Sequence, residues 1–324
     1  MLRFFVRTIF TLLVLSSFSL SFGQTTYPDK PIKIVVPYPP GGFTDILGRL
    51  LANQLQPRLG QNVIVDNKGG GGSTIGTNLV ARAPADGYTL LLVAPDLAIN
   101  ESLIPARLSY DARKDFSPVI RAALSPMVLV TNPSVPAKNM AEFLALAKTN
   151  PGKINFASGG VGTGAHLALE LLKTRAGVDL NHVPYKGNGP ATTDLLGGQV
   201  SAMFLQYAVA KPYILSGKLN MLATPSGKRS PAIPDVPTIA ESGLSGFDVE
   251  PWFGIVAPVG TPPAVIGRLN LEISKIMQQN DVKEMLAGVG ATPSVSSPQE
   301  FAKFIDSEVT RWSEVVKASG AKAE

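Results

Sequence analysis

The chain contains no cysteine and only two histidines, His166 and His182, among its 324 residues. Without cysteine it can form no disulfide and can carry no lipid on a lipobox cysteine. A metal site would have to be built mostly from carboxylates, and no suitable spacing of acidic residues occurs. We therefore expect a protein without disulfides, without a lipid anchor and without a bound metal.

Charge of either sign is also sparse. Charged residues make up 16% of the chain, and the formal net charge at pH 7 is +5. No dense basic stripe with interleaved aromatic residues occurs, so we expect no nucleic-acid partner. The length is too great for one small core and suits two domains of ordinary size, stabilised mainly by apolar burial.

Long hydrophobic runs are absent except near the first residue. Residues Thr8–Phe22 carry no charge and follow Arg3 and Arg7, as in the leader of an exported protein. Ser21 and Gly23 fit the −3 and −1 positions of a signal-peptidase site, so residues 1–23 are predicted to be a signal peptide. A membrane anchor is the alternative, but the run is shorter than about 20 residues and is diluted by serine. We expect a soluble periplasmic protein that is not lipid-anchored.

Strand-like and helix-like patterns alternate in the next part of the chain. Apolar runs predict strands at Ile32–Val36, Asn62–Asp66 and Tyr88–Val93. Apolar residues at helical spacing predict helices at Phe43–Gln56 and Thr74–Ala83. Such alternation is typical of βαβ units, in which a parallel sheet is covered by helices on both faces.

The pattern restarts near Met127, and we therefore predict an α/β fold with two lobes, each a largely parallel sheet flanked by helices. Residues 24–124 and 248–324 would form lobe 1, and residues 125–247 would form lobe 2. The last helix starts with a capping box at Ser297 and carries one apolar stripe, which we expect to pack on lobe 1.

Two glycine-rich loops, each between a predicted strand and a predicted helix, are the strongest functional signal. The first is Pro39–Asp45 (PPGGFTD) and the second is Ser158–His166 (SGGVGTGAH). Glycine lets the backbone approach a ligand closely, and amides at a helix start point outward with the positive end of the helix dipole. Neither loop contains lysine, arginine or cysteine. The sequence therefore predicts a small anion held from both sides by the amides of Gly41–Phe43 and Gly160–Gly164.

Enzymatic functions fit these loops less well. The second loop formally matches a dinucleotide fingerprint, but the acid that should follow is not clearly at the end of the next strand. Ser158 and His166 could suggest hydrolysis, yet the GxSxG nucleophile elbow is missing. We expect no cofactor and no catalytic residue. An exported hydrolase or isomerase acting on a small acid is the alternative, and an ordered Ser–His–acid triad in the cleft would favour it.

Several side chains allow both a structural and a binding role. Asp45 would cap its helix or orient the first loop. Ser158 and Thr163 are predicted to hydrogen-bond a ligand, although Ser158 could instead be a helix cap. Lys186 is either a turn residue or a cleft residue, and Gly69–Gly72 is either a flexible turn or part of the cleft wall.

Six motifs in order carry a family resemblance. They are PPGGFTD at the first loop, then SGGVGTGAHLALEL, HVPYKG, TDLLGGQV, KRSPAIPDVPTIAESG and EPWFGIVAPVGTP. From about Tyr27 to its last helix the chain resembles the Bug family, periplasmic solute receptors of the tripartite tricarboxylate transporter type. The resemblance implies a Venus-flytrap receptor that binds a small carboxylate between two α/β lobes for uptake or sensing. Membrane components of such a transporter are the implied partners, and we expect a monomer.

The resemblance also implies which positions hold the carboxylate, through amides, hydroxyls and bridging water. Asp96 departs from the small polar residue of many relatives, and an acid there would repel one end of a dicarboxylate or select an amine-bearing ligand. With Phe43 added from the amide argument, the predicted ligand-binding residues are Pro40, Gly41, Gly42, Phe43, Thr44 and Asp45 in lobe 1, and Ser158, Gly159, Thr163, Gly164, Ala165 and His166 in lobe 2.

Overall fold

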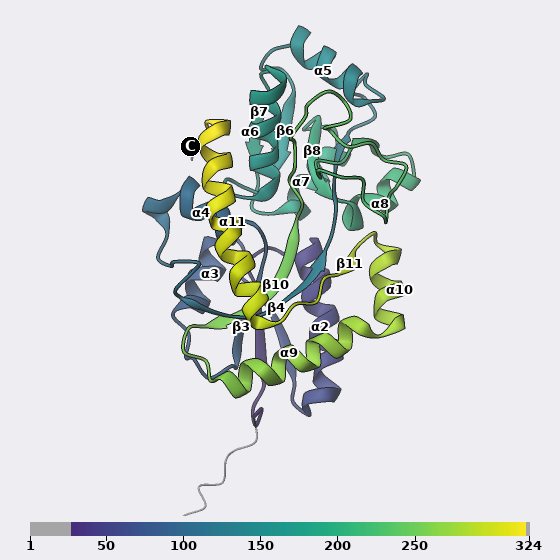
Figure 1. Cartoon of the computed structure of the whole chain (residues 1–324). Helices are drawn as coiled ribbons and strands as arrows, with labels where there is room; N and C mark the ends of the chain where they lie inside the picture. Colours follow the sequence, from purple (N-terminus) through teal and green to yellow (C-terminus); the bar gives the residue numbers. More distant parts are fainter. Residues whose placement is uncertain (1–26, 322–324) are drawn as a thin grey trace, which may run out of the picture.

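The computed structural model describes residues 27–321, which form two lobes, each built around one β-sheet (Figure 1). The signal peptide predicted for residues 1–23 lies outside the described residues. Within them, no helix combines the length and the apolar composition needed to cross a bilayer. The two-lobed α/β fold predicted from the sequence is confirmed.

The first sheet has six strands in the order β11-β4-β10-β3-β1-β2. Strand β1 pairs in parallel with β2 and β3, whereas β10 pairs antiparallel with β3 and β4. The sheet is therefore mixed rather than largely parallel, because β10 enters it from the other lobe and runs in the opposite direction. The strands are β1 Ile32–Val36, β2 Val63–Asn67, β3 Thr89–Val93, β4 Phe116–Leu124, β10 Trp252–Pro258 and β11 Thr292–Pro293.

The second sheet repeats this plan with five strands in the order β7-β6-β8-β5-β9. Strand β6 pairs in parallel with β7 and β8, whereas β5, which arrives directly after β4, pairs antiparallel with β8 and β9. The strands are β5 Met127–Thr131, β6 Asn155–Ser158, β7 Asn181–Pro184, β8 Ala202–Gln206 and β9 Asn220–Ala223.

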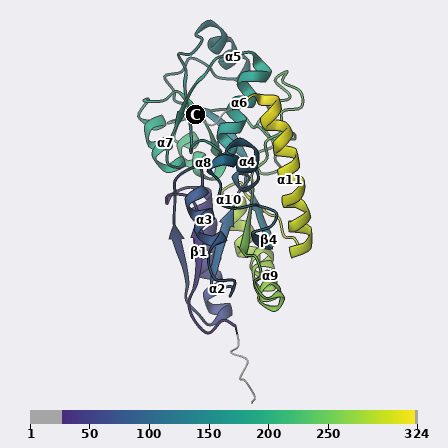
Figure 2. The same ribbon diagram turned by 90° about the vertical axis from the view of Figure 1, so that its left-hand side faces the viewer.

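Helices cover the faces of both sheets (Figures 1 and 2). Strand β10 is buried along its whole length, so it needs apolar cover on both faces. Helix α2 buries Leu47, Leu51 and Leu55 and ends at Gly60, whose left-handed backbone favours glycine. The helices are α2 Phe43–Leu59, α3 Thr74–Ala81, α4 Asp96–Leu103, α5 Met140–Thr149, α6 Gly164–Ala176, α7 Asn188–Leu196, α8 Tyr207–Leu215, α9 Pro263–Gln278, α10 Asn280–Gly288 and α11 Pro298–Ser319, with a 3-10 turn at Pro105–Arg107.

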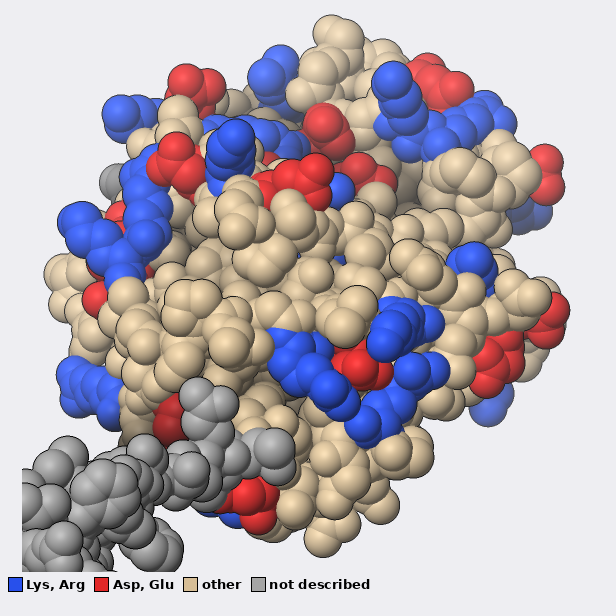
Figure 3. Space-filling view, turned by 60° about the horizontal axis from the view of Figure 1, so that its bottom comes forward, with Lys and Arg blue, Asp and Glu red and all other residues tan. Residues whose placement is uncertain are grey.

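Charged side chains of both signs share the molecular surface. On the face shown in Figure 3, lysine and arginine side chains lie beside aspartate and glutamate rather than forming a field of one sign. Glu272 on α9, for example, lies within 3.4–3.6 Å of Arg58, Arg268 and Lys275. The expectation that no nucleic acid binds stays a prediction.

The last helix, α11, joins the two lobes rather than packing on lobe 1 alone. It contacts α4 and β4 in the first lobe and α6 in the second (Figure 2). Its start has the predicted capping box, in which the hydroxyl of Ser297 accepts from the amide of Glu300 at 3.2 Å. Near its other end, the Thr174 hydroxyl donates to the carbonyl oxygen of Ser319 at 2.8 Å. The apolar stripe therefore lies along the junction of the lobes.

A buried carboxylate fixes α11 to the strand that connects the lobes. Glu308 is 4% exposed and accepts hydrogen bonds from the indole nitrogens of Trp252 at 2.7 Å and Trp312 at 2.9 Å. Arg311 donates to its other oxygen at 2.9 Å. Both indoles are fully buried, so no water can replace the carboxylate as their acceptor.

We predict that Glu308→Ala lowers the free energy of unfolding by about 2–6 kcal/mol, because two buried indole N–H groups each lose their acceptor at about 1–3 kcal/mol. Glu314→Ala is the matched control, since Glu314 is an exposed glutamate on the same helix, and it should change stability by less than about 0.5 kcal/mol. Urea unfolding followed by circular dichroism measures both. Equal effects of the two substitutions would contradict an anchoring role for Glu308.

Candidate functional site

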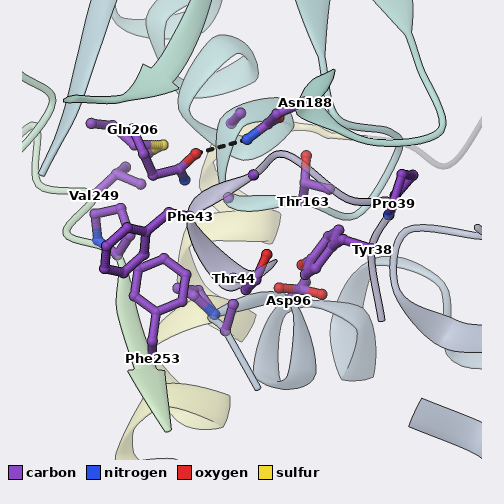
Figure 4. A pocket seen from close by; sticks show the side chains of 17 residues that line it. Tyr38, Pro39, Phe43, Thr44, Asp96, Thr163, Asn188, Gln206, Val249 and Phe253 are labelled. Atoms are coloured by element: carbon purple, nitrogen blue, oxygen red, sulfur yellow. Dashed lines mark hydrogen bonds between the residues drawn. The ribbon is translucent and has the colours of Figure 1, made fainter. Parts of the chain in front are cut away.

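The two glycine-rich loops meet at one cavity between the lobes (Figure 4). Helices α2, α4 and α6 begin there, each shortly after a strand, as the topology of open α/β sheets requires. The cavity offers about 50 Å³ to the centres of water molecules, against about 10–15 Å³ for one water. Its lining is Tyr38, Pro39, Gly42, Phe43, Thr44, Ala94, Pro95, Asp96, Met127, Thr163, Gly164, Ala165, Asn188, Gln206, Val249, Pro251 and Phe253.

Asp45 holds the first loop from behind. Its carboxylate accepts from the amide of Gly41 at 3.2 Å, from Arg49 Nε at 3.0 Å and from Asn67 Nδ2 at 3.0 Å. Burial alone would raise the pKa of Asp45, but the hydrogen bonds from Arg49, Asn67 and Gly41 outweigh it and lower the pKa. The loop is thereby shaped so that Gly42, the residue before α2, faces the cavity.

Thr163 caps the helix that follows the second loop. Its hydroxyl accepts from the amide of His166 at 3.3 Å and donates to the carbonyl oxygen of Gly160 at 2.8 Å. This is the geometry of an N-cap, so the hydroxyl is already engaged in hydrogen bonds within the loop. What the second loop offers to the cavity is therefore the start of α6, with Gly164 and Ala165.

Ser158 lies beneath the second loop, with no exposed surface. Its hydroxyl lies 2.6 Å from His182 Nε2 and accepts from the amide of Gly160 at 3.1 Å. The ring of His182 stacks on that of His166, with 4.4 Å between ring centres. Burial lowers the pKa of both rings to about 4, with a further contribution from the charge of Lys173.

The structure brings half of the sequence-predicted residues to the cavity wall. Six line it: Gly42, Phe43, Thr44, Thr163, Gly164 and Ala165. Six do not: Pro40, Gly41, Asp45, Ser158, Gly159 and His166. Members of the second set lie directly behind the first, as the contacts of Asp45 and Ser158 show. A role for these residues in ligand binding stays a prediction.

Sequence reasoning missed part of the wall. Tyr38, Asn188, Gln206 and Phe253 are not among the predicted ligand-binding residues, and Asp96 was noted only as a departure from the family pattern. The amide of Asn188 donates to Gln206 Oε1 at 2.7 Å across this wall (Figure 4). Their place in the chain could have identified them, because most of these residues follow a strand or begin a helix at the edge where the two glycine-rich loops lie.

Thr44 presents a hydroxyl to the cavity. Thr44 lies in the first turn of α2, and its side chain makes no hydrogen bond to the other lining residues drawn in Figure 4. Unlike the hydroxyl of Thr163, it is therefore free to donate to a bound anion, beside the positive end of the α2 dipole. Thr44 is the polar side chain of the first loop best placed to contact a ligand.

The lobes touch one another around the cavity through glycines. A methyl group added at Gly72 would overlap the carbonyl oxygen of Val161 in the other lobe, and one added at Gly162 would overlap Asn100. At Gly187 an added methyl would lie 2.6 Å from Pro39. These approaches need residues without a Cβ, so the structure shows the lobes closed over the cavity.

The geometry agrees with the comparison to known protein families. The model described as the tripartite tricarboxylate transporter family receptor matches residues 47–321. The chain belongs to this receptor family. The resemblance to Bug receptors that the sequence carries is thereby confirmed.

Members of the receptor family resemble this chain over nearly all of its length. Protein BugT of Bordetella pertussis is 44% identical over 299 residues, which cover 92% of this chain and 91% of BugT. The solved structure of R. palustris Rpa4515 with adipate has a TM-score of 0.88 and 34% identity, covering 91% of this chain and 99% of Rpa4515. MatC from Rhodopseudomonas palustris with bound malate has a TM-score of 0.85 and 34% identity, covering 90% and 100%.

We predict that Gly72→Ala holds the lobes apart. Gly60→Ala is the matched control, because both glycines have φ near +60° to +70° but only Gly72 faces the other lobe. Each substitution should cost about 1–2 kcal/mol of stability through left-handed strain. Only Gly72→Ala should enlarge the radius of gyration in small-angle X-ray scattering. The same radius for both variants would contradict the closed arrangement.

Acid should destabilise the receptor between pH 6.5 and about 4. Both histidines have folded-state pKa values below the unfolded value, so the unfolded chain binds protons first and stability falls as the pH falls. The loss for the buried ring of His166 is at most about 3 kcal/mol. Melting temperatures across this range measure it, and His166→Gln should flatten the decline. If the melting temperature of His166→Gln falls with pH as steeply as that of the wild type, other groups cause the acid response.

Proposed function

We propose that this chain is a periplasmic receptor that captures a small carboxylate in the cavity between its lobes. One observation carries the proposal: the starts of α2 and α6, from opposite lobes, face the same cavity. Amides and dipoles at helix starts favour an anion. The adipate and malate held by the two R. palustris relatives support a carboxylate as that anion.

In this proposal the ligand contacts come from the wall residues of both loops. The amides near Gly42 and Thr44 bind from lobe 1, and those of Gly164 and Ala165 bind from lobe 2. The other predicted residues shape the loops or reach the ligand through water. They are Pro40, Gly41, Asp45, Ser158, Gly159, Thr163 and His166. The receptor acts as a monomer, and its partners are the membrane components of a tripartite tricarboxylate transporter.

Binding rather than catalysis is the proposed role of this site. The hydroxyl of Ser158 and the ring of His182 do form a pair, but Ser158 is fully buried and does not line the cavity. In the described part of the chain, no carboxylate hydrogen-bonds to either imidazole that could orient it as a base. The Ser–His–acid arrangement expected of a hydrolase is therefore not supported.

A panel of small carboxylates, followed by thermal melting, tests the proposal. A ligand present at 100 times its dissociation constant stabilises the folded state by about 2.7 kcal/mol, which raises the melting temperature by several degrees. The panel should include dicarboxylates such as adipate and malate, monocarboxylates and amino acids, with matched amines and alcohols as controls. If no carboxylate in the panel raises the melting temperature, the proposed function is refuted.

We predict opposite effects for two hydroxyl deletions. Thr44→Val removes a donor that faces the cavity, so affinity for the carboxylate found in the panel should fall about 10- to 150-fold with stability nearly unchanged. Ser158→Ala deprives the partly buried imidazole of His182 of its partner, so stability should fall by about 1 kcal/mol. Calorimetric titration and urea unfolding of each variant measure both quantities. If Ser158→Ala reduces affinity and leaves stability intact, Ser158 contacts the ligand directly.

A further inference from the structure

One charged side chain of the cavity, Asp96, has no counter-ion. It begins α4 and is 3% exposed, and its carboxylate lies beside Tyr38 and Thr44 in the cavity wall (Figure 4). Among the described residues, no lysine, arginine or histidine contributes to the pKa of Asp96. Burying a carboxylate without a cation is costly, so such a group calls for a partner that arrives with the ligand.

The rest of the described cavity wall offers no cation to a second ligand carboxylate, and its two side-chain amides, of Asn188 and Gln206, hydrogen-bond to each other. No lysine, arginine or histidine is among the lining residues that the structure describes. A dicarboxylate would therefore bring two negative charges to a wall whose one described carboxyl side chain is that of Asp96. The helix starts accommodate one anionic group, and Asp96 disfavours another beside it.

The side of the cavity away from Asp96 is largely apolar, with the amide of Gln206 at its edge (Figure 4). The rings of Phe43 and Phe253 meet edge to face, with 4.7 Å between their centres, and Val249 lies beside them (Figure 4). Met127 and Pro251 complete this apolar side. Such a surface favours a hydrocarbon or aromatic group and penalises a charged one. The wall therefore has four chemically distinct parts: helix starts, one carboxylate, an apolar side and the paired amides of Asn188 and Gln206.

We propose that Asp96 binds the protonated amine of the ligand, so that the receptor selects a zwitterionic amino acid with an apolar side chain. The ligand carboxylate lies at the starts of α2 and α6, its ammonium pairs with Asp96, and its side chain lies against Phe43 and Phe253. This assignment rests on the proposed function and goes further by naming the class of carboxylate and the residue that selects it.

A protonated Asp96 is the competing arrangement. Burial raises the pKa of Asp96, whereas the hydroxyls of Ser73 and Tyr38 lower it. In its acid form Asp96 would donate a hydrogen bond to a second ligand carboxylate, and a dicarboxylate would then bind best. The two arrangements favour opposite charges on the ligand. Ionised Asp96 favours a ligand amine, whereas protonated Asp96 favours a second carboxylate.

Matched ligand pairs in calorimetric titrations separate the arrangements. The pairs are L-leucine with 4-methylpentanoate and L-phenylalanine with 3-phenylpropanoate, each differing by the amine alone, and adipate and malate complete the set. Wild-type protein should bind the amino acid of at least one pair 10-fold or more tighter than its partner. In Asp96→Asn, which keeps the shape of the side chain, this ratio should fall to within about threefold.

Two further variants keep the result interpretable. Asp66→Asn removes one charge from the same lobe outside the cavity and should leave the ratio unchanged. If Asp96→Asn does not fold, Asp96→Ser replaces it, with the same expected loss of the ratio. Preference for the amine-free ligands, or a ratio that persists without Asp96, would overturn the assignment. If adipate or malate binds and no amino acid does, the assignment is overturned but the proposed function stands. If no carboxylate binds, both are overturned.

Discussion

The two-lobed arrangement depends on a buried carboxylate at the junction of the lobes. Glu308 accepts from the indoles of Trp252 and Trp312, and so ties the last helix to β10, the strand that carries the chain back from the second lobe to the first. Strand β10 pairs with both β3 and β4, and α4 begins shortly after the end of β3. Helix α11 also packs against α4, the helix that begins at Asp96, so the anchor and the cavity wall are connected through this helix pair.

The cavity illustrates how an anion site can be built without a cationic side chain. Helix starts supply fixed amides whose partial charges need no counter-ion. Because these amides belong to the backbone, no side-chain entropy is lost when they bind an anion. Asp45 and Ser158 then serve the amides indirectly, by holding the loops in shape from behind. A site made in this way is nearly neutral, so a single buried acid such as Asp96 can decide its selectivity.

Local patterns in the sequence predicted the elements well and the orientation of side chains poorly. The first strand, the glycine loops and the capping box at Ser297 follow from periodicity and loop chemistry, which are properties of neighbouring residues. The mixed sheets, the helix that begins at Asp96 and the double attachment of α11 depend on contacts between distant segments. Ser158 shows the limit most clearly, because a serine in a glycine loop can face either the cavity or another side chain beneath the loop, here the partly buried imidazole of His182.

The attachment of α11 to both lobes has a practical consequence for following lobe motion. The described chain starts at the far end of lobe 1, whereas α11 ends against α6 of lobe 2, so the two ends lie on different lobes (Figure 1). Fluorescent proteins fused at these ends would ride on different lobes, and their energy transfer would respond to the hinge. The architecture of the receptor thus already has the layout of a genetically encoded sensor for the molecule it captures.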